Sequence, residues 1–427
     1  MISAFKRNLG WIFTGNIIHA VLQFALNVYC ARQFGADDFG ILNYSVSLIA
    51  FFSAIGTLGF NGVITKFFAE DESNTGRYLF TCIVSRIFFA IVSIIFLQVI
   101  IRFDKDYTSL LGVIVLCQSL QILFESLDLF VYWFRYKNQA KEVAIIRLLS
   151  FALSAVWRFV AIYYHSLIWY TIGVSIETGV FMLLLFLLYK KEFGACQFQF
   201  DRGRLRTVLT ISYPFIFSAV LSTIYSQTDK IMLKSMVDFS SVGIYSVSLT
   251  LAGAIVILPV ALIEGFRPEI MIHKVNNEEQ YKRRLKQLYG SIFWICIAYC
   301  LFITFFSKTI VSLIYGPAYL GAVSSLSVIV WYTSFSYFGA VNNLYLVAEG
   351  QTKWVQIITL AGAILNLLLN YILIPKWGIV GAAWASLFTQ VFANYILLWV
   401  IVPLIQCVYL LNSGIALRWL QLPKRMK

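Results

Sequence analysis

Long apolar runs separated by short polar connections dominate this chain. The runs at 83–101, 168–189, 292–306 and 357–374 each approach the roughly 20 residues that cross a bilayer core as a helix. Hydropathy and the breaks between runs predict twelve spans: 9–31, 41–64, 79–101, 108–134, 143–163, 167–189, 207–233, 242–265, 287–307, 319–346, 354–374 and 379–402. The connections are too short for a soluble domain, so we expect function to lie within a membrane or at its edges.

Composition supports this interpretation. Hydrophobic residues make up 60% of the 427 residues and charged residues 12%, whereas about a quarter of a soluble domain is charged. Lys6 and Arg7 precede an apolar run that lacks a small-residue cleavage site, which predicts an uncleaved first span. The seven cysteines show no metal-ligand spacing. The pattern predicts an all-α polytopic membrane protein without a metal or cofactor.

The basic residues predict the orientation of the spans. Most of the 33 Lys and Arg residues fall in connections on one side, which the positive-inside rule assigns to the cytoplasm together with both termini. This bias accounts for much of the net charge of +13 without a nucleic-acid partner. The basic residues on the opposite side are Arg32, Arg102, Lys105, Lys234, Lys308 and Lys376, and those within spans are Arg86, Arg158 and Lys230.

A repeated pentapeptide indicates an internal duplication. The sequence YSVSL occurs at 44–48 and 245–249, where it opens the second and eighth spans, and the same offset places Lys66 on Arg267. Six spans per half would give a parallel repeat related by a pseudo-two-fold axis along the membrane normal. A chance match in apolar sequence is the alternative.

This duplication predicts the domain organisation. An N-terminal six-helix lobe spans 1–190 and a C-terminal six-helix lobe spans 207–402. A basic cytoplasmic linker, 191–206, joins them, and 403–427 forms a cytoplasmic or interfacial tail.

Ionisable residues within the spans are the candidate site residues. Each costs about 2.5–3.5 kcal/mol on insertion scales and usually faces a bundle interior or a water-filled cavity. One interpretation is structural pairing, for example of Arg86 with Glu125 or Asp128, and the other is a polar cavity. The spacing of Glu125, Asp128, Tyr132 and Arg135 places them on one helical stripe. The candidates are Arg86, Glu125, Asp128, Arg158, Glu177, Asp229, Lys230, Glu264 and Arg267.

Other motifs carry less information. His19 is expected to be a packing residue rather than a proton carrier. Gly59 and Pro259, in the second span of each half, indicate a gate or hinge, with close helix packing as the alternative. Asp104-Lys105-Asp106 imitates a DxD motif but is expected to be a solvated turn.

Four segments resemble a known family. FGADDFGILNYSVSLIAFFSAIGTLGF (34–60), YPFIFSAVLSTIYSQTDKIML (213–233), VGIYSVSL (242–249) and IPKWGIVGAAWASL (374–387) are similar to the polysaccharide repeat-unit flippases, the Wzx-type O-antigen translocases. These belong to the multidrug/oligosaccharidyl-lipid/polysaccharide (MOP) exporter superfamily. The segment 127–147 departs from the FQG-type sequence common in that family, which leaves the particular sugar open.

The resemblance implies a bacterial inner-membrane flippase that moves an undecaprenyl-pyrophosphate-linked oligosaccharide to the outer leaflet by alternating access, possessing no enzymatic activity. Polysaccharide polymerase and chain-length proteins would be its partners, beside the lipid-linked substrate and membrane lipids. The implied headgroup contacts are Arg32, Lys66, Arg86, Lys230 and Arg267. The residues that would balance these charges, or accept a coupling proton or sodium ion, are Glu125, Asp128, Asp229 and Glu264.

Two alternatives stay open. A cation-coupled multidrug exporter would have the same fold but would need acidic groups in its cavity. A membrane-embedded glycosyltransferase or polymerase would share the hydropathy, but such enzymes usually carry catalytic residues in a large outward loop, and the outward loops predicted here are short.

Overall fold

Helices form all the regular structure in the part of the chain that the computed structural model describes, residues 2–71, 74–193, 199–401 and 404–416. They group into two compact units, Met1–Gln227 (unit 1) and Thr228–Lys427 (unit 2). The division falls within α8 (Arg202–Met236). The two six-helix lobes joined by a linker at 191–206 stay a prediction.

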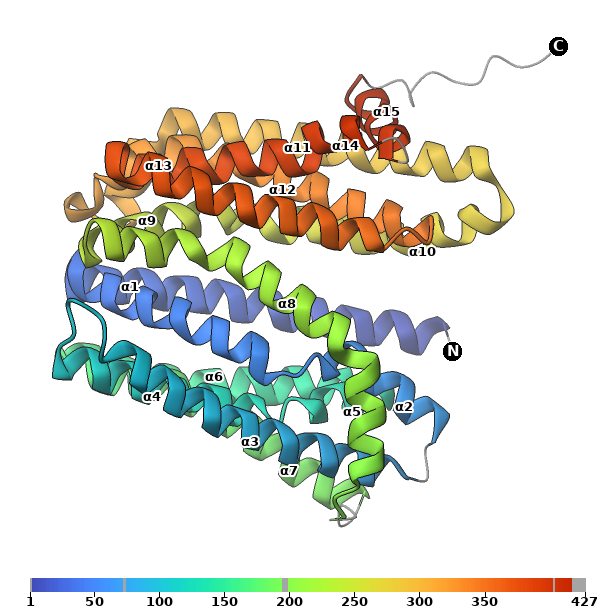
Figure 1. Ribbon diagram of the computed structural model, residues 1–427, viewed down its shortest axis with the longest axis horizontal. Helices are drawn as coiled ribbons and strands as arrows, with labels where there is room; N and C mark the ends of the chain where they lie inside the picture. Colours follow the sequence, from blue (N-terminus) through green and yellow to red (C-terminus); the bar gives the residue numbers. More distant parts are fainter. Residues whose placement is uncertain (1, 72–73, 194–198, 402–403, 417–427) are drawn as a thin grey trace. The chain divides into compact units, whose positions relative to one another are not determined.

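Unit 1 is a bundle built around α1 (Figure 1). α1 packs against α3, α4 and α6, and α7 packs against α4 and α6. The short helices α2 and α5 pack against each other. Its helices are α1 (Ile2–Gly56), α2 (Ile64–Glu70), α3 (Thr75–Ile101), α4 (Ser109–Glu125), α5 (Leu129–Tyr136), α6 (Ala140–Tyr163), α7 (Leu167–Phe193) and the first part of α8.

Unit 2 is built around α12, which packs against α9, α10, α11 and α13. α15 packs against α11 and lies within the segment expected to be a tail, whose residues 417–427 fall outside the described part. The helices that follow α8 are α9 (Phe239–Ala252), α10 (Ile257–Asn276), α11 (Glu278–Ile314), α12 (Ala322–Ala348), α13 (Lys353–Val391), α14 (Leu397–Val400) and α15 (Ile405–Ile415).

Nine helical stretches among the described residues are long and apolar enough to cross a membrane. Two of them are interrupted at a glycine with positive φ, Gly35 in α1 (φ 80°, ψ 178°) and Gly378 in α13 (φ 53°, ψ −129°). Glycine adopts such angles without a Cβ penalty. Both lie between consecutive predicted spans, so the chain breaks where the hydropathy pattern expects it. The count of twelve spans stays a prediction.

Side-chain caps begin several helices. Thr108 accepts a hydrogen bond from the Leu111 amide at 3.1 Å ahead of α4, and Asp238 accepts one from the Ser241 amide at 2.7 Å ahead of α9. Ahead of α8, the main-chain amides of Arg204 and Gly203 donate to Asp201. These bonds stabilise the carboxylate and lower the pKa of Asp201 below its ordinary value.

Gly59 occupies a tight turn between α1 and α2. Its φ of 63° is left-handed, and a Cβ there would lie 2.7 Å from the Ser212 carbonyl oxygen and 2.9 Å from the Ile216 nitrogen, both on α8. The second predicted span therefore unwinds at this glycine. Pro259 is buried near the start of α10, directly after the 3-10 segment Gly253–Val256. Their role as gate or hinge stays a prediction.

Replacing Gly59 by Ala should destabilise unit 1 by about 1–3 kcal/mol, because the new Cβ meets main-chain atoms and the backbone angle is strained. Thermal unfolding of the purified protein in detergent measures the effect as a lower melting temperature. Gly56→Ala is the matched control, since its Cβ would make only a 3.4 Å contact with Ile122. Equal melting temperatures for the two variants would contradict the close approach.

Candidate functional site

Unit 1 contains two polar cavities that meet at Glu125. The first, of about 510 Å³, has polar lining residues from α1, α4, α8 and the turn after α1: Ser53, Thr57, Asn61, Gln118, Gln121, Glu125 and Thr223. The second, of about 300 Å³, has the polar lining residues His19, Glu125, Asp128, Tyr132, Arg135, Arg147, Glu177 and Thr178. Such a concentration of polar groups on helices able to cross a membrane is costly and makes these cavities the candidate functional site.

Arg86 anchors a polar network that includes a lining residue of each cavity, Asn61 of the first and Asp128 of the second. Its side chain is 1% exposed, and its guanidinium donates to Asp128 at 2.5 Å, to the Asn61 amide oxygen at 3.2 Å and to the Glu125 carbonyl oxygen at 2.9 Å. Asn61 also donates to Asp128 at 3.2 Å. The structural pairing that the sequence suggested for Arg86 and Asp128 is thus present. It ties α3 to the connection between α4 and α5.

Glu177 on α7 gathers a second network. Arg158, also 1% exposed, pairs with Glu177 and donates to Ser154 at 2.6 Å. His19 lies 2.9 Å from the other carboxylate oxygen. His19 is therefore satisfied by a polar partner and also lines the second cavity.

Glu125 differs from these acids because its partners are neutral. Its carboxylate accepts hydrogen bonds from Ser53 and, at 2.6 Å, from Gln121. Within the described ranges it has no ion-pair partner. A carboxylate without a cation at the junction of two cavities is suited to accepting a proton or a small cation.

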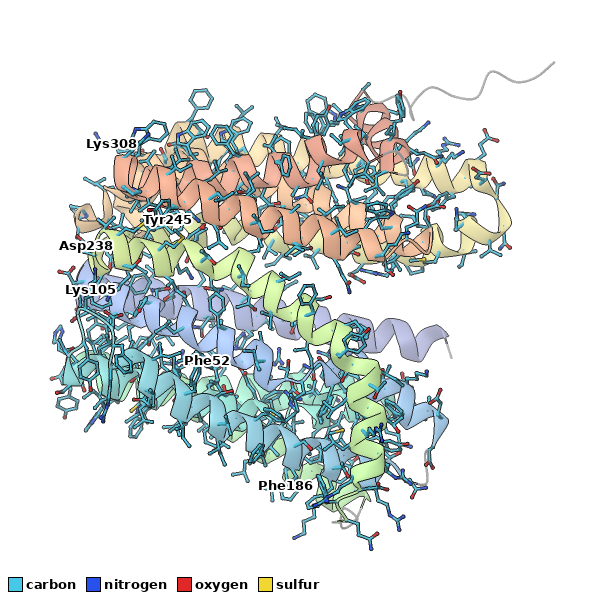
Figure 2. All side chains as sticks on the ribbon, viewed as in Figure 1. Phe52, Lys105, Phe186, Asp238, Tyr245 and Lys308 are labelled. Carbon is cyan, nitrogen blue, oxygen red and sulfur yellow. The ribbon has the colours of Figure 1, made fainter. Side chains whose placement is uncertain are left out.

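In unit 2 the corresponding feature is Asp229 on α8, which is 5% exposed. Tyr245 donates to its carboxylate at 2.9 Å, Asn370 donates at 2.6 Å, and Ser386 donates as well. Asn370 also donates to Asn366 at 3.0 Å. The cradle combines oxygen acceptors and hydroxyl groups from α8, α9 and α13, and Tyr245 is labelled on α9 in Figure 2.

The two copies of YSVSL therefore serve different partners. Tyr44 donates to Asp104 at 2.7 Å, in the connection between α3 and α4 that carries Lys105 (Figure 2), whereas Tyr245 donates to the buried Asp229. The residue sixteen positions before Tyr44 is Val28, so unit 1 has no acid at the position of Asp229. Asp104 of the DxD-like sequence Asp104-Lys105-Asp106 therefore takes part in the contact with Tyr44.

The other predicted headgroup residues are dispersed. Arg32 and Lys66 are exposed, and Lys66 lies 3.6 Å from Glu70. Arg267 pairs with Glu264 at 2.7 Å, with both side chains more than 40% exposed. Lys230 is half-buried on α8 beside Asp229. The structure thus brings together Arg86, Asp128 and Glu125 in unit 1 and Glu264 with Arg267 in unit 2, and the binding roles of all these residues stay predictions.

Sequence reasoning missed the amide and hydroxyl groups that surround Asp229 and Glu125. Asn366 and Asn370 are four residues apart in an apolar run, a spacing that places them on one helical face and was available from the sequence. Arg147, near the start of the predicted span 143–163, was counted with the basic residues of the cytoplasmic side and was not proposed as a site residue, yet it lines the second cavity. Ser53 gives no signal, because serines are common in apolar helices.

The sequence matches a known protein family and is similar to named proteins. Residues 5–268, more than half of the chain, match the family described as Polysaccharide biosynthesis protein. The probable low-salt glycan biosynthesis flippase Agl15 of Haloferax volcanii is 22% identical over 385 residues, which cover 88% of this chain and 79% of that protein.

Solved structures share the fold. The lipid II flippase MurJ in an inward closed conformation aligns with a TM-score of 0.74 at 16% identity, covering 97% of this chain and 93% of MurJ. An inward-facing multidrug resistance MATE family transporter of the MOP superfamily aligns with a TM-score of 0.72 at 12% identity, covering 95% and 96% of the two chains.

At these identities the structural likeness shows the fold, which is that of the MOP superfamily. The apolar helices and this fold make the chain a multi-pass membrane protein. By its match over 5–268 the chain belongs to the Polysaccharide biosynthesis protein family.

Proposed function

We propose that this protein is a flippase that translocates a lipid-linked oligosaccharide between membrane leaflets by alternating access. The observation that carries the proposal is the pair of polar cavities within a bundle of apolar helices. A glycan and its phosphates cannot cross hydrocarbon unaided, whereas the lipid tail never has to leave it. Polar cavities on the path of the headgroup lower that barrier.

The proposed substrate is an undecaprenyl-pyrophosphate-linked repeat unit of an O-antigen or related surface polysaccharide, moved from the cytoplasmic to the outer leaflet of a bacterial inner membrane. Both termini are then cytoplasmic, as the basic residues predict. A polysaccharide polymerase and chain-length proteins would act next on the product. The names of the relatives, a glycan biosynthesis flippase and a lipid II flippase, support this class of substrate.

Arg32, Lys66, Arg86, Lys230 and Arg267 are the proposed headgroup contacts, and Asp128 and Glu264 balance the charges of Arg86 and Arg267. Asp229 and Glu125 are the proposed ion-coupling groups, because both carboxylates are held by neutral donors. Gly59 and Pro259 are the proposed hinges, since the helical geometry changes beside each of them.

A multidrug exporter of the same fold is the second candidate, favoured by the two carboxylates that lack a basic partner in the described structure. Deleting the gene separates the candidates. A flippase leaves lipid-linked units with a complete glycan in the cytoplasmic leaflet, and an exporter leaves drug sensitivity without such lipids. Incomplete lipid-linked units would instead indicate a glycosyltransferase.

Replacing Arg86 or Lys230 by Ala should reduce surface polysaccharide at least tenfold in a strain lacking its own flippase, since each removes a proposed headgroup contact. Polysaccharide and protein level are measured together. Arg206→Ala, which removes an exposed arginine on α8, is the control. Normal polysaccharide from both variants would exclude these two residues from the headgroup role.

The double variant Arg86→Ala/Asp128→Ala separates binding by Arg86 from its structural pairing. Removing Arg86 alone leaves Asp128 unpaired, which costs about 3–5 kcal/mol for a buried pair, and removing both charges relieves this cost. We expect the double variant to recover protein level but not polysaccharide. Recovery of both would make Arg86 a structural residue only.

Asp229→Asn should uncouple transport from the ion gradient while the side-chain volume stays nearly the same. The amide cannot carry the charge that a proton or sodium ion neutralises. Flipping of a fluorescent lipid-linked saccharide in proteoliposomes, with an imposed pH or sodium gradient, measures the coupling. Glu279→Gln, at an exposed carboxylate on α11, should leave it unchanged. A gradient response that survives in Asp229→Asn would exclude Asp229 as the coupling site.

A further inference from the structure

Two arginines in the second cavity of unit 1 are used by neither of its networks. Arg135 on α5 and Arg147 on α6 both line the 300 Å³ cavity, and both also line a smaller one of about 20 Å³. Their guanidinium carbons lie over aromatic rings, Arg135 at 5.7 Å from the centre of Tyr132 and Arg147 at 5.0 Å from the centre of Phe181.

Throughout the described ranges, neither guanidinium donates a side-chain hydrogen bond or forms an ion pair. The acids of the cavity are already engaged. Asp128 accepts from Arg86, Glu177 pairs with Arg158 and His19, and Glu125 accepts from Ser53 and Gln121. Each arginine carries five N–H donors and a permanent charge. Arg135 on α5 and Arg147 on α6 therefore bring unused hydrogen-bond donors to this cavity.

The fold holds these charges near each other against their mutual repulsion. Arg135 and Arg147 are permanent cations that line the same two cavities, so they repel each other, and the Glu177 carboxylate offsets this only in part because Arg158 shares it. The turn between α5 and α6 passes through Asn138 with φ 61°, which folds the helices back to one cavity. Gly15 lets α1 approach α6 beside Arg147, since a Cβ there would lie 2.9 Å from the Ala144 Cβ.

An anion between the two guanidinium groups would remove this repulsion. Arginine donors match phosphate oxygens in a bidentate geometry, and a group with two adjacent negative charges satisfies two arginines at once. A cavity of 300 Å³ corresponds to about ten water molecules at about 30 Å³ each, enough for a diphosphate.

We propose that Arg135 and Arg147 form a binding site for a phosphate or diphosphate group, on the side of unit 1 that the basic residues predict to be cytoplasmic. Resting on the proposed function, the site receives the diphosphate of the lipid-linked substrate before translocation. It is separate from Arg86 and Arg158, whose charges are neutralised by carboxylates.

Binding to the full-length protein purified in detergent tests the site. Titrations follow tryptophan fluorescence with three probes: farnesyl diphosphate, inorganic pyrophosphate, and farnesol carried in the detergent micelles. Farnesyl diphosphate should bind, inorganic pyrophosphate should compete with it, and farnesol should not. The variant Arg135→Gln/Arg147→Gln should raise the Kd for farnesyl diphosphate at least tenfold.

Arg202→Gln/Arg206→Gln is the matched control, because it removes two exposed arginines of α8 and the same charge. Arg147→Lys keeps the charge but not the fork of donors and should weaken binding by a smaller factor. Melting temperatures of all variants report whether each is folded.

The binding measurements distinguish a phosphate site at Arg135 and Arg147 from the absence of one. Loss of binding in the cavity variant but not in the control supports the site, and competition by inorganic pyrophosphate identifies the phosphate group as the recognised part. Equal affinities of both double variants, or no binding of farnesyl diphosphate by the unchanged protein, would overturn it. Flipping is measured separately in proteoliposomes, so absent flipping with intact binding would reject the proposed function and leave the site standing.

Discussion

The need to neutralise charge within apolar helices organises the interior of this protein. A charge at membrane depth is stable only when it is paired, hydrogen-bonded or in contact with water. Arg86 and Arg158 satisfy this need with Asp128 and Glu177, and both guanidinium groups are almost wholly buried. Arg158 and Glu177 join α6 to α7, and Arg86 and Asp128 join α3 to the connection between α4 and α5. The contacts that stabilise these charges therefore also position residues that line the cavities.

The two units meet the constraint in different ways. Unit 1 uses ion pairs and leaves Glu125 with hydroxyl and amide donors, while unit 2 surrounds Asp229 with Tyr245, Asn370 and Ser386. Hydrogen bonds from neutral donors stabilise the charged form of a carboxylate but leave its negative charge in place, whereas an arginine would neutralise that charge. Glu125 and Asp229 are therefore the acids best able to exchange a proton or cation, which agrees with their proposed coupling role.

The same reasoning distinguishes arginines that are already paired with a carboxylate from arginines that are not. A guanidinium already held by a carboxylate has fewer donors for a ligand, and releasing it leaves an unpaired acid. Arg135 and Arg147 have no such partner in the described structure and share a cavity. Their permanent charges make an anionic headgroup the natural ligand of that cavity. The amide groups that line the first cavity, Gln118, Gln121 and Asn61, suit the neutral hydroxyl groups of a glycan.

The sequence alone determined the membrane class, the helical architecture and the positions of most spans, because about 20 apolar residues are needed to cross a bilayer and leave a strong linear signal. It also identified Arg86, Glu125, Asp128 and Asp229 as candidate site residues, since ionisable residues stand out in apolar runs. Only the tertiary structure decided which donor binds which acid, because partners such as Asn61 and Ser386 come from distant segments and carry no linear signal. It likewise decided that Arg147 lines a cavity with Arg135, because the packing of α1, α5 and α6 and not the local sequence sets where that side chain lies.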